Sequence, residues 1–587
     1  MAQLSKYTYL FAICTCFSFL DAWNIGANDV ANSFSTSVSS RSLTMKQAMA
    51  IAAVMKLSGS LAVGSRVTDT IRLKIVDPKL YEQEPSVLLL AMTCTIIASA
   101  IFLTFATRQG LPVSTTHSLV GGLVGAATAS VGITKVDWSI NGASQVFAAW
   151  FVAPGISGCL GAALFLFTKY FILTKHNAPR KAFYSIPVYT FITVGLLTML
   201  LAWKGVQSRV DLTTEQVIMA VFITGGGATA LEVFFILPFI WRKIMVEDWQ
   251  LRWWEVWQGP WLLKRPPPPP PPPSMSRGNV KNYYRGHLTR DELNQIRRSE
   301  TLMQSVQNSP NLPSTLDNDD NNDEIQILPP PAISVTEPPP AARGEEEDGT
   351  RTVNDELIPP KPPGPWYTVH VLIWYVNRVL LRGLEKDVIM MQKRNAVLSW
   401  NLDDMHARAA HYDNRAEYMY SALQILTAAT ASFIHGANDV SNSIGPFTSA
   451  YHVWSTGEIP SQVGVPLWIL AMGGCGIVIG LLTYGYHVMR NMGNRLTLIS
   501  PSRGFCMELA SAMTILIATR LSLPVSTTQC IAGALVGVGL ANGDWRCINL
   551  RLVAWIYGGW IITLPCTAFM SGSLMSLIIN APRWDNN

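Results

Sequence analysis

The tetrapeptide Gly-Ala-Asn-Asp occurs twice in this chain, each time inside an apolar stretch about as long as one membrane span. The copies start at Gly26 and Gly436, and both continue as Val-x-Asn-Ser. A second element, Leu-Pro-Val-Ser-Thr-Thr, starts at Leu111 and again at Leu523. The two pairs have nearly the same separation, so one register holds across most of the chain. Two different motifs at one spacing indicate an internal duplication, which is common among membrane carriers.

The composition places the chain in a membrane. Of its 587 residues 49% are hydrophobic and only 14% charged, which is too apolar for a soluble protein. Seven apolar stretches of spanning length precede a long polar segment and five follow it. We predict an all-α polytopic membrane protein with about twelve transmembrane segments, in two inverted repeats with broken helices. The stretches lie near 8–30, 46–64, 88–107, 112–132, 144–170, 186–203, 216–241, 416–450, 465–488, 504–520, 524–541 and 552–580.

The polar segment separates two membrane halves, and we predict four parts in the chain. It contains an unbroken proline run at Pro266–Pro273, which favours polyproline II, followed by sequence typical of disorder. Because seven spans precede the loop and five follow it, both termini lie on one side of the membrane and the loop on the other. Cytoplasmic loops are rich in Lys and Arg, and the short loops on the side of the long loop carry most of these residues. We therefore predict that the long loop is cytoplasmic and the termini extracellular. The predicted parts are an N-terminal membrane half with extra spans (1–243), a disordered loop (244–365), an interfacial amphipathic helical segment (366–415) and a C-terminal membrane half (416–587).

The Asn-Asp motifs have the residues of a cation site. In a helix, residues four apart share one side, so Asn28 lies with Asn32 and Asp29 with Ser33. A carboxylate with amide and hydroxyl oxygens suits a partly dehydrated sodium ion and leaves little uncompensated charge in lipid. Gly26 and Gly436 are positions where we expect the helix to unwind and offer carbonyl ligands. The alternative is a buried polar network between helices. The predicted sodium ligands are Asn28, Asp29, Asn32, Asn438, Asp439 and Asn442.

The Leu-Pro-Val-Ser-Thr-Thr elements are suited to an anion. Proline removes a backbone donor and pushes the preceding residue out of helical geometry, so the helix breaks there. A new helix then begins, and its N-terminal N–H groups and dipole attract an anion. An ordinary helix N-cap is the simpler interpretation. Glycine spacings behind each element, 121–125 and 533–537, predict close helix packing. The predicted anion ligands are Ser114, Thr115, Thr116, Ser526, Thr527 and Thr528.

Duplicated halves that each have a cation site and an anion site indicate a secondary transporter for a small oxyanion. No Walker-type phosphate loop is found in the sequence, so coupling to a cation gradient is expected and no enzymatic activity or organic cofactor is predicted. No basic patch with interleaved aromatic residues suggests nucleic acid.

The Gly-Ala-Asn-Asp-Val and Pro-Val-Ser-Thr-Thr motifs closely resemble those of the PiT family of inorganic phosphate transporters. The stretches around 24–44 and 500–508 are most similar to the fungal sodium-coupled phosphate permeases. The resemblance implies sodium–phosphate symport at the plasma membrane. It implies sodium at Asp29, Asp439 and their neighbours, and phosphate at the two Ser-Thr-Thr elements.

Two residues depart from the family pattern. Relatives usually have a glutamate where this chain has Lys56. The lysine could bring charge to the anion site, replace a bound cation or disable transport, and the remaining carboxylate Glu508 is its expected partner. The first Ser-Thr-Thr element is followed by His117 and the second by Gln529, which we include among the phosphate ligands.

Two alternative functions remain open. The first, suggested by the Lys56 change, is a transporter-like phosphate sensor that moves little substrate. The second is a proton-coupled carrier of another tetrahedral anion such as sulfate or arsenate. The predicted partners are inorganic phosphate, sodium and membrane lipid. A second copy of the chain and regulatory proteins at the cytoplasmic loop are further candidates, and the plasma membrane is the expected location.

Overall fold

The computed structural model describes residues 4–75, 77–139, 142–202, 212–270, 280–307, 358–393, 398, 401–459, 464–521, 523 and 525–581. All regular elements in these ranges are helical, and each of the twelve apolar stretches contains a helix. These helices are α1 (Thr8–Ser39), α2 (Met45–Ile75), α3 (Pro85–Gln109), α4 (Thr115–Ser130), α5 (Ala143–Thr168), α6 (Ala178–Leu200), α7 (Thr214–Leu231), α14 (Asn414–Thr456), α15 (Leu467–Tyr484), α17 (Pro501–Arg520), α18 (Thr527–Leu540) and α19 (Leu550–Ile579).

Eight helical segments among the described residues are long and apolar enough to cross a membrane. Two of the others are too short to cross alone, because α4 has 16 residues and α18 has 14. At about 1.5 Å per residue these helices are roughly 24 and 21 Å long, against a hydrocarbon thickness of about 30 Å. Both short helices begin at a Ser-Thr-Thr element, as the sequence predicts. The count of twelve transmembrane segments therefore stays a prediction.

The short helix α4 folds back along α3. Gly110, with φ of 70°, ends α3 in the left-handed conformation that glycine allows. The chain then reverses, so that Ser118 on α4 donates to Ser99 on α3 at 3.1 Å. Farther along the pair, Tyr81 and Ser130 are hydrogen-bonded at 2.8 Å. The helices α3 and α4 thus form a hairpin whose tip carries the first Ser-Thr-Thr element.

The Asn-Asp motifs lie on unbroken helices, contrary to our expectation of unwinding. Helix α1 continues through Gly26 and α14 through Gly436. A Cβ at Gly26 would collide with the backbone of Ile477 on α15, and one at Gly436 with the backbone of Lys56 on α2. The two glycines are therefore needed for close helix crossing, and the carbonyls next to them stay in helical hydrogen bonds.

The two halves exchange their packing partners. The first helix of each half crosses the second helix of the other, as α1 crosses α15 and α14 crosses α2. The short helices do the same, since α4 packs on α19 and α18 on α5. A Cβ at Gly125 would collide with Ala568, and one at Gly537 with Gly158. The close packing predicted from the glycine spacings is confirmed in both halves.

Shorter elements join and cover the bundle. They are α8 (Leu237–Met245), α9 (Trp261–Lys264), α10 (Arg290–Gln307), α11 (Val369–Leu380), α12 (Val388–Lys393), α13 (Leu402–Ala407) and α16 (Tyr486–Met489), with π-helical turns at Lys169–Leu173 and Glu232–Ile236 and 3₁₀ turns at Ser5–Tyr7, Pro78–Tyr81, Ile133–Lys135, Trp253–Gln258, Gly493–Arg495 and Trp545–Cys547. Helix α11 has 12 residues, about 18 Å, which is too short to span the hydrocarbon.

The predicted disorder of 244–365 is wrong for part of this segment. Tyr284 is buried, and its hydroxyl donates to Glu417 on α14 at 2.7 Å. His287 contacts His406 of α13 at 3.0 Å between their Nδ1 atoms. The rings of Tyr284 and His287 pack against the bundle. The average composition of the segment is polar, so it does not reveal these single packed residues. Two acidic clusters in the sequence of this segment, at 317–324 and 345–348, lie outside the described residues.

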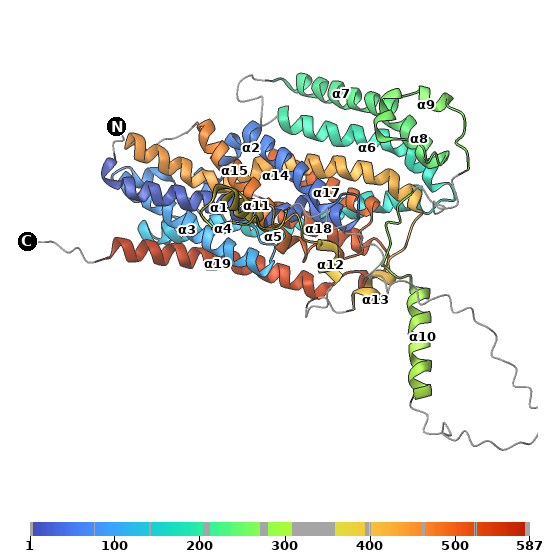
Figure 1. Ribbon diagram of the computed structural model, residues 1–587. Helices are drawn as coiled ribbons and strands as arrows, with labels where there is room; N and C mark the ends of the chain where they lie inside the picture. The colour runs from blue at the N-terminus through green and yellow to red at the C-terminus, as the bar shows by residue number, and fades with distance from the viewer. Residues whose placement is uncertain are drawn as a thin grey trace, which may run out of the picture.

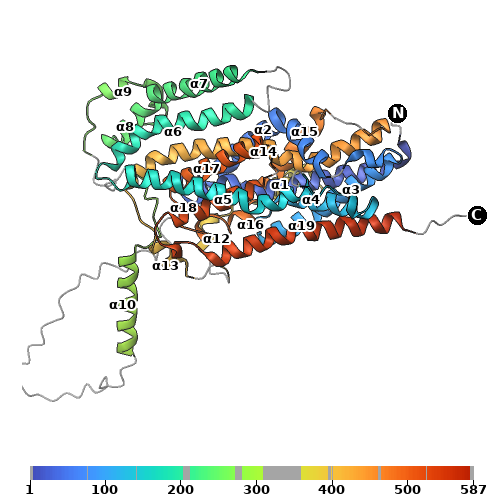
Figure 2. The same cartoon turned by 180° about the vertical axis from the view of Figure 1, so that it is seen from behind.

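The helices of the bundle run side by side along one axis (Figure 1). The start of α1 and the end of α19 lie at one end of this axis, and α10, α12 and α13 lie at the other. Helices α6 and α7 form a layer beside the bundle, with α6 packed on α14, and the view from behind shows the same layer (Figure 2).

We predict that Gly26→Ala destabilises the protein because its Cβ meets backbone that cannot rotate away. Overpacking of this kind costs about 1–3 kcal/mol. The matched control is Gly227→Ala in α7, where a Cβ meets nothing within 4 Å. Thermal unfolding in detergent should show a lower midpoint for Gly26→Ala alone. Equal midpoints would contradict the close crossing.

Candidate functional site

The tip of the α3–α4 hairpin is held by Asn28 of α1. Its amide nitrogen donates to Thr107 Oγ1 and to the Leu111 carbonyl, each at 3.1 Å. Its oxygen accepts from the Val113 N–H at 3.2 Å. Both polar atoms of the carboxamide are thus bonded to the end of α3 and the turn between α3 and α4. The role of Asn28 as a sodium ligand stays a prediction. Asn438, the equivalent residue of the second Asn-Asp motif, is half-buried.

Asp29 is the point where both Ser-Thr-Thr elements meet. Its Oδ2 accepts from Thr115 Oγ1, and its Oδ1 from Thr528 Oγ1, each at 3.2 Å. Asn32, one turn along α1, donates to Oδ1 at 3.0 Å. The N-termini of α4 and α18, which come from different halves, therefore converge on one fully buried carboxylate.

The amides of the motifs cross between the halves. Asn32 of α1 donates to Thr527 Oγ1 at 3.3 Å and to Thr528 Oγ1 at 2.8 Å. Asn442 of α14 makes the reciprocal contacts, donating to Thr115 Oγ1 at 3.0 Å and to Thr116 Oγ1 at 3.2 Å. Each Asn-Asp motif is thereby joined to the Ser-Thr-Thr element of the other half. The predicted cation ligands and anion ligands form one site.

The serines of the two elements cap their helices differently. Ser114 is the N-cap of α4 and accepts from the His117 N–H at 3.2 Å. Ser526 has the equivalent place on α18, where its side chain makes no capping bond among the described residues. The N-cap interpretation therefore accounts for Ser114 and leaves the Ser526 hydroxyl to other contacts.

Asp439, the counterpart of Asp29, has a different environment. The Lys56 ammonium nitrogen lies 2.7 Å from its Oδ2, and both side chains are buried. The predicted pairing of Lys56 with Glu508 is wrong. Glu508 accepts instead from four neutral side chains of α1 and α14, because it lies against their polar faces: Thr36, Ser37, Gln424 and Thr427.

Several buried polar atoms around the motifs have no hydrogen-bond partner within the described part of the chain. Both amide atoms of Gln529 are among them, as are Asn32 Oδ1, Asp439 Oδ1 and His117 Nε2. Native proteins leave few buried polar groups unsatisfied, so such a group calls for an explanation. Their gathering at the two motifs is what a polar substrate site requires.

Two neighbours of the site, His435 and Trp150, were not among the residues predicted from the sequence. His435 shares a hydrogen bond of 2.9 Å between its Nδ1 and Ser33 Oγ. Trp150 donates to His117 Nδ1 at 3.0 Å. His435 could have been noticed because it directly precedes the second motif, at a position where the first copy has the apolar Ile25. Trp150 had no comparable signal, because α5 has no repeated motif around it.

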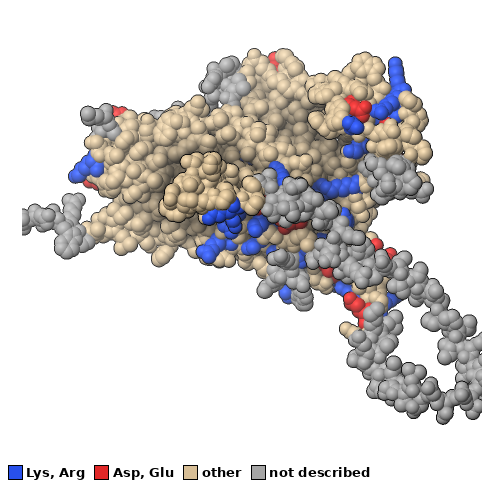
Figure 3. Space-filling model, in the orientation of Figure 1, with Lys and Arg blue, Asp and Glu red and all other residues tan. Residues whose placement is uncertain are grey.

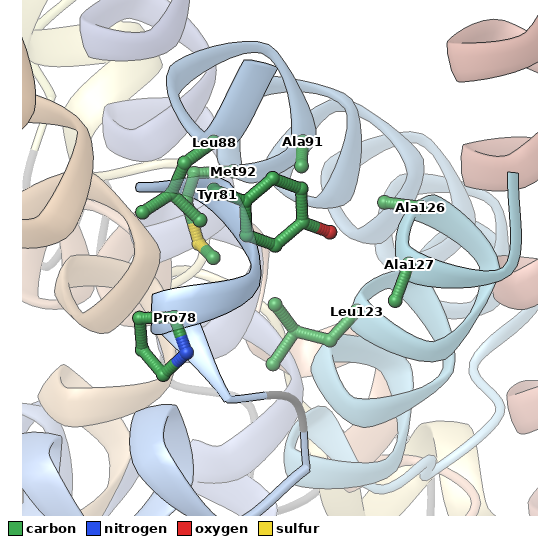
Figure 4. A pocket seen from close by; sticks show the side chains of 8 residues that line it. All are labelled: Pro78, Tyr81, Leu88, Ala91, Met92, Leu123, Ala126 and Ala127. Atoms are coloured by element: carbon green, nitrogen blue, oxygen red, sulfur yellow. The ribbon is translucent and has the colours of Figure 1, made fainter. Parts of the chain in front are cut away.

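A small apolar pocket lies elsewhere, between the start of α3, the end of α4 and the turn before α3 (Figure 4). The Tyr81 hydroxyl supplies its polar atom and is bonded to Ser130. This lining does not suit a charged substrate. The pocket is lined by Pro78, Tyr81, Leu88, Ala91, Met92, Leu123, Ala126 and Ala127.

A buried polar site at the crossing of two exchanged halves is the arrangement found in multi-pass membrane transporters. The chain matches the model of the PHO4 phosphate transporter family over residues 25–571, and it belongs to that family. The resemblance inferred from the motifs is thus confirmed, and the chain is a transporter and not an enzyme.

Named relatives are similar in sequence to this chain over nearly its whole length. It is 48% identical to the phosphate-repressible phosphate permease pho-4 of Neurospora crassa, over 99% of both chains. It is 27% identical to sodium-dependent phosphate transporter 2 of Xenopus laevis, over 93% of this chain and 94% of that protein. A solved structure described as "The sodium-dependent phosphate transporter" has the same fold, with a TM-score of 0.57 at 23% identity, covering 98% of this chain and 100% of that one.

We predict that Gln529→Leu leaves stability unchanged or raises it while impairing phosphate uptake, because no hydrogen bond among the described residues is lost. The matched comparison is Gln424→Leu, which breaks bonds to Ser40, Ser42 and Glu508. Leaving such buried groups unsatisfied costs about 1–3 kcal/mol each. Unfolding midpoints and radiolabelled uptake separate the two variants. A strong loss of stability in Gln529→Leu would show that Gln529 is structural.

Proposed function

We propose that this protein is a sodium-coupled symporter that imports inorganic phosphate across the plasma membrane. The observation that carries the proposal is Asp29, whose carboxylate is bonded to hydroxyls from both Ser-Thr-Thr elements. An anion bound by these hydroxyls would lie beside a buried carboxylate. The repulsion between them is large in a low-dielectric interior. A cation at Asp29 removes it, so each substrate favours binding of the other.

The Ser-Thr-Thr hydroxyls, the N-termini of α4 and α18 and the Gln529 amide would bind phosphate. Neutral hydroxyls and amides suit an anion that must leave again, because they bind it without the full attraction of a fixed cation. Sodium would take carboxylate and amide oxygens at Asp29 and Asn32, with Asn28 fixing the hairpin tip. The Asn-Asp motif of the second half has the same residue types, with Lys56 beside Asp439.

The arrangement of charge supports a membrane orientation. On the face shown in Figure 3, Lys and Arg gather toward the end of the bundle that carries α10. By the positive-inside rule this end would be cytoplasmic, and the start of α1 and the end of α19 would be extracellular. Twelve segments in two inverted repeats, with α3–α4 and α17–α18 as broken elements, complete the proposed topology. Helix α11 packs against α15 about midway along the bundle (Figure 1), and its exposed apolar side chains would meet lipid there.

We predict that Asp29→Asn raises the sodium concentration for half-maximal phosphate uptake tenfold or more, because the amide attracts a cation far less. The control is Asp77→Asn on the exposed turn before α3, where an amide oxygen can still accept from Lys79 N–H. Proteoliposomes with purified protein and an inward sodium gradient give the measurement. An unchanged sodium dependence would refute the cation assignment.

The same uptake assay distinguishes the alternative functions. Robust uptake that survives removal of sodium would favour a proton-coupled carrier, and competition by sulfate or arsenate would show its anion. Tight phosphate binding without uptake would favour the sensor.

We predict that Thr528→Val raises the KM for phosphate by about one to two orders of magnitude, as a lost hydrogen bond to a charged group costs about 1.5–3 kcal/mol. The matched control is Thr567→Val in α19, whose hydroxyl bonds only to its own helix among the described residues. A higher KM in both variants would indicate a general packing effect.

We predict that deletion of residues 308–357 preserves transport, because a polar, proline-rich sequence typical of disorder does not build a buried site. Residues 280–307 must be kept, since Tyr284 is bonded to Glu417. Uptake per correctly delivered molecule should equal that of the full chain. A loss would assign a direct role to the deleted stretch.

A further inference from the structure

The reciprocal crossing of the two halves identifies the counterpart of Lys56. The backbone of Lys56 faces Gly436, and the backbone of Ile477 faces Gly26. One turn farther along, Gly59 faces the Phe433 backbone, and Gly480 faces that of Trp23. The two second helices therefore present equivalent positions to the two motifs, and these positions hold a lysine in α2 and an isoleucine in α15.

This difference decides the charge beside each aspartate. Asp29 accepts hydrogen bonds from Asn32, Thr115 and Thr528, all of them neutral. Asp439 accepts from the Lys56 ammonium at 2.7 Å. Its Oδ1 has no partner among the described residues. The second aspartate is thus neutralised from within the protein and the first is not.

The neighbouring backbone fixes the ammonium in this place. Ser60 donates to the carbonyls of Lys56 and Gly436, at 2.8 and 3.0 Å, and joins α2 to α14 beside the ion pair. Lys56 is fully buried, so its charge cannot reach water. Glu508, which could compete for the ammonium, is already bonded to four neutral side chains.

We infer that the Lys56 ammonium is a tethered cation that takes the place of a co-transported sodium ion at Asp439, so that sodium binds on the Asp29 side alone. An ammonium and a sodium ion both carry one positive charge and both bind carboxylate oxygen. The lysine differs in remaining with the protein through the transport cycle. The inference rests on the proposed symport and deepens it by fixing how many cations accompany phosphate.

Stability alone does not account for an ion pair at this position. Buried ion pairs contribute little to stability compared with apolar residues of similar volume, because desolvation offsets their attraction. The isoleucine at the matched position shows that this crossing is compatible with an apolar side chain. One sodium fewer also changes the electrical balance, since one sodium ion with one monovalent phosphate carries no net charge.

The test counts the sodium ions bound by the purified full-length chain with saturating inorganic phosphate, by equilibrium binding of ²²Na⁺. Lys56→Met keeps the apolar stem and frees Asp439, and it should bind one more sodium ion per chain than the unmodified protein. The double variant Lys56→Met/Asp439→Asn replaces the pair with neutral residues and should return to the unmodified number. In proteoliposomes the ratio of sodium to phosphate transported should rise by one in Lys56→Met.

Equal sodium binding by Lys56→Met and the unmodified chain would overturn the inference. So would the loss of one sodium ion in the double variant relative to the unmodified chain, a result that does not depend on folding of Lys56→Met. A tenfold higher phosphate KM in Lys56→Met with unchanged sodium number would show that Lys56 binds the anion instead. Sodium-independent uptake by the unmodified chain would defeat the proposed symport, whereas the difference in bound sodium between variants still decides the role of Lys56.

Discussion

The close crossing of helices from opposite halves is the constraint on which the rest of the structure depends. At Gly26 and Gly436 the first helix of each half touches the backbone of the other half's second helix. Small residues at such contacts give van der Waals packing where lipid supplies no hydrophobic driving force. The crossing also sets the distance between the motifs, and so allows Asn32 and Asn442 to reach the Ser-Thr-Thr elements of the opposite half.

The site combines approximate symmetry in residues with asymmetry in charge. Its two aspartates are fully buried, which is costly unless each is compensated. Asp29 is compensated by hydroxyls and an amide from three helices, whereas Asp439 is compensated by Lys56. Neutral donors can give way to a cation, and a covalently held ammonium resists exchange. In the proposed symport, only Asp29 would therefore take a reversible ion.

Much of this arrangement could be predicted from the motifs. The helix starts at Thr115 and Thr527 follow from proline chemistry, and the glycine spacings at 121–125 and 533–537 do mark close packing. The prediction that the helix unwinds at Gly26 was wrong. Glycine is suited both to irregular backbone and to close helix contact, and the sequence does not show which of the two roles applies. The buried contact of Tyr284 was missed because average polarity conceals single anchoring residues.

The sequence by itself determined the membrane class, the duplication, the helix breaks and the residue types of the site, since these depend on local composition and backbone chemistry. The tertiary structure decided which residues meet: Asn32 with the opposite Ser-Thr-Thr element, Lys56 with Asp439 and Glu508 with neutral donors. Partner choice depends on where distant helices cross, and helix crossings are set by packing between residues hundreds of positions apart. A carboxylate can be recognised from its neighbours in sequence, but its charge partner is known only from its neighbours in space.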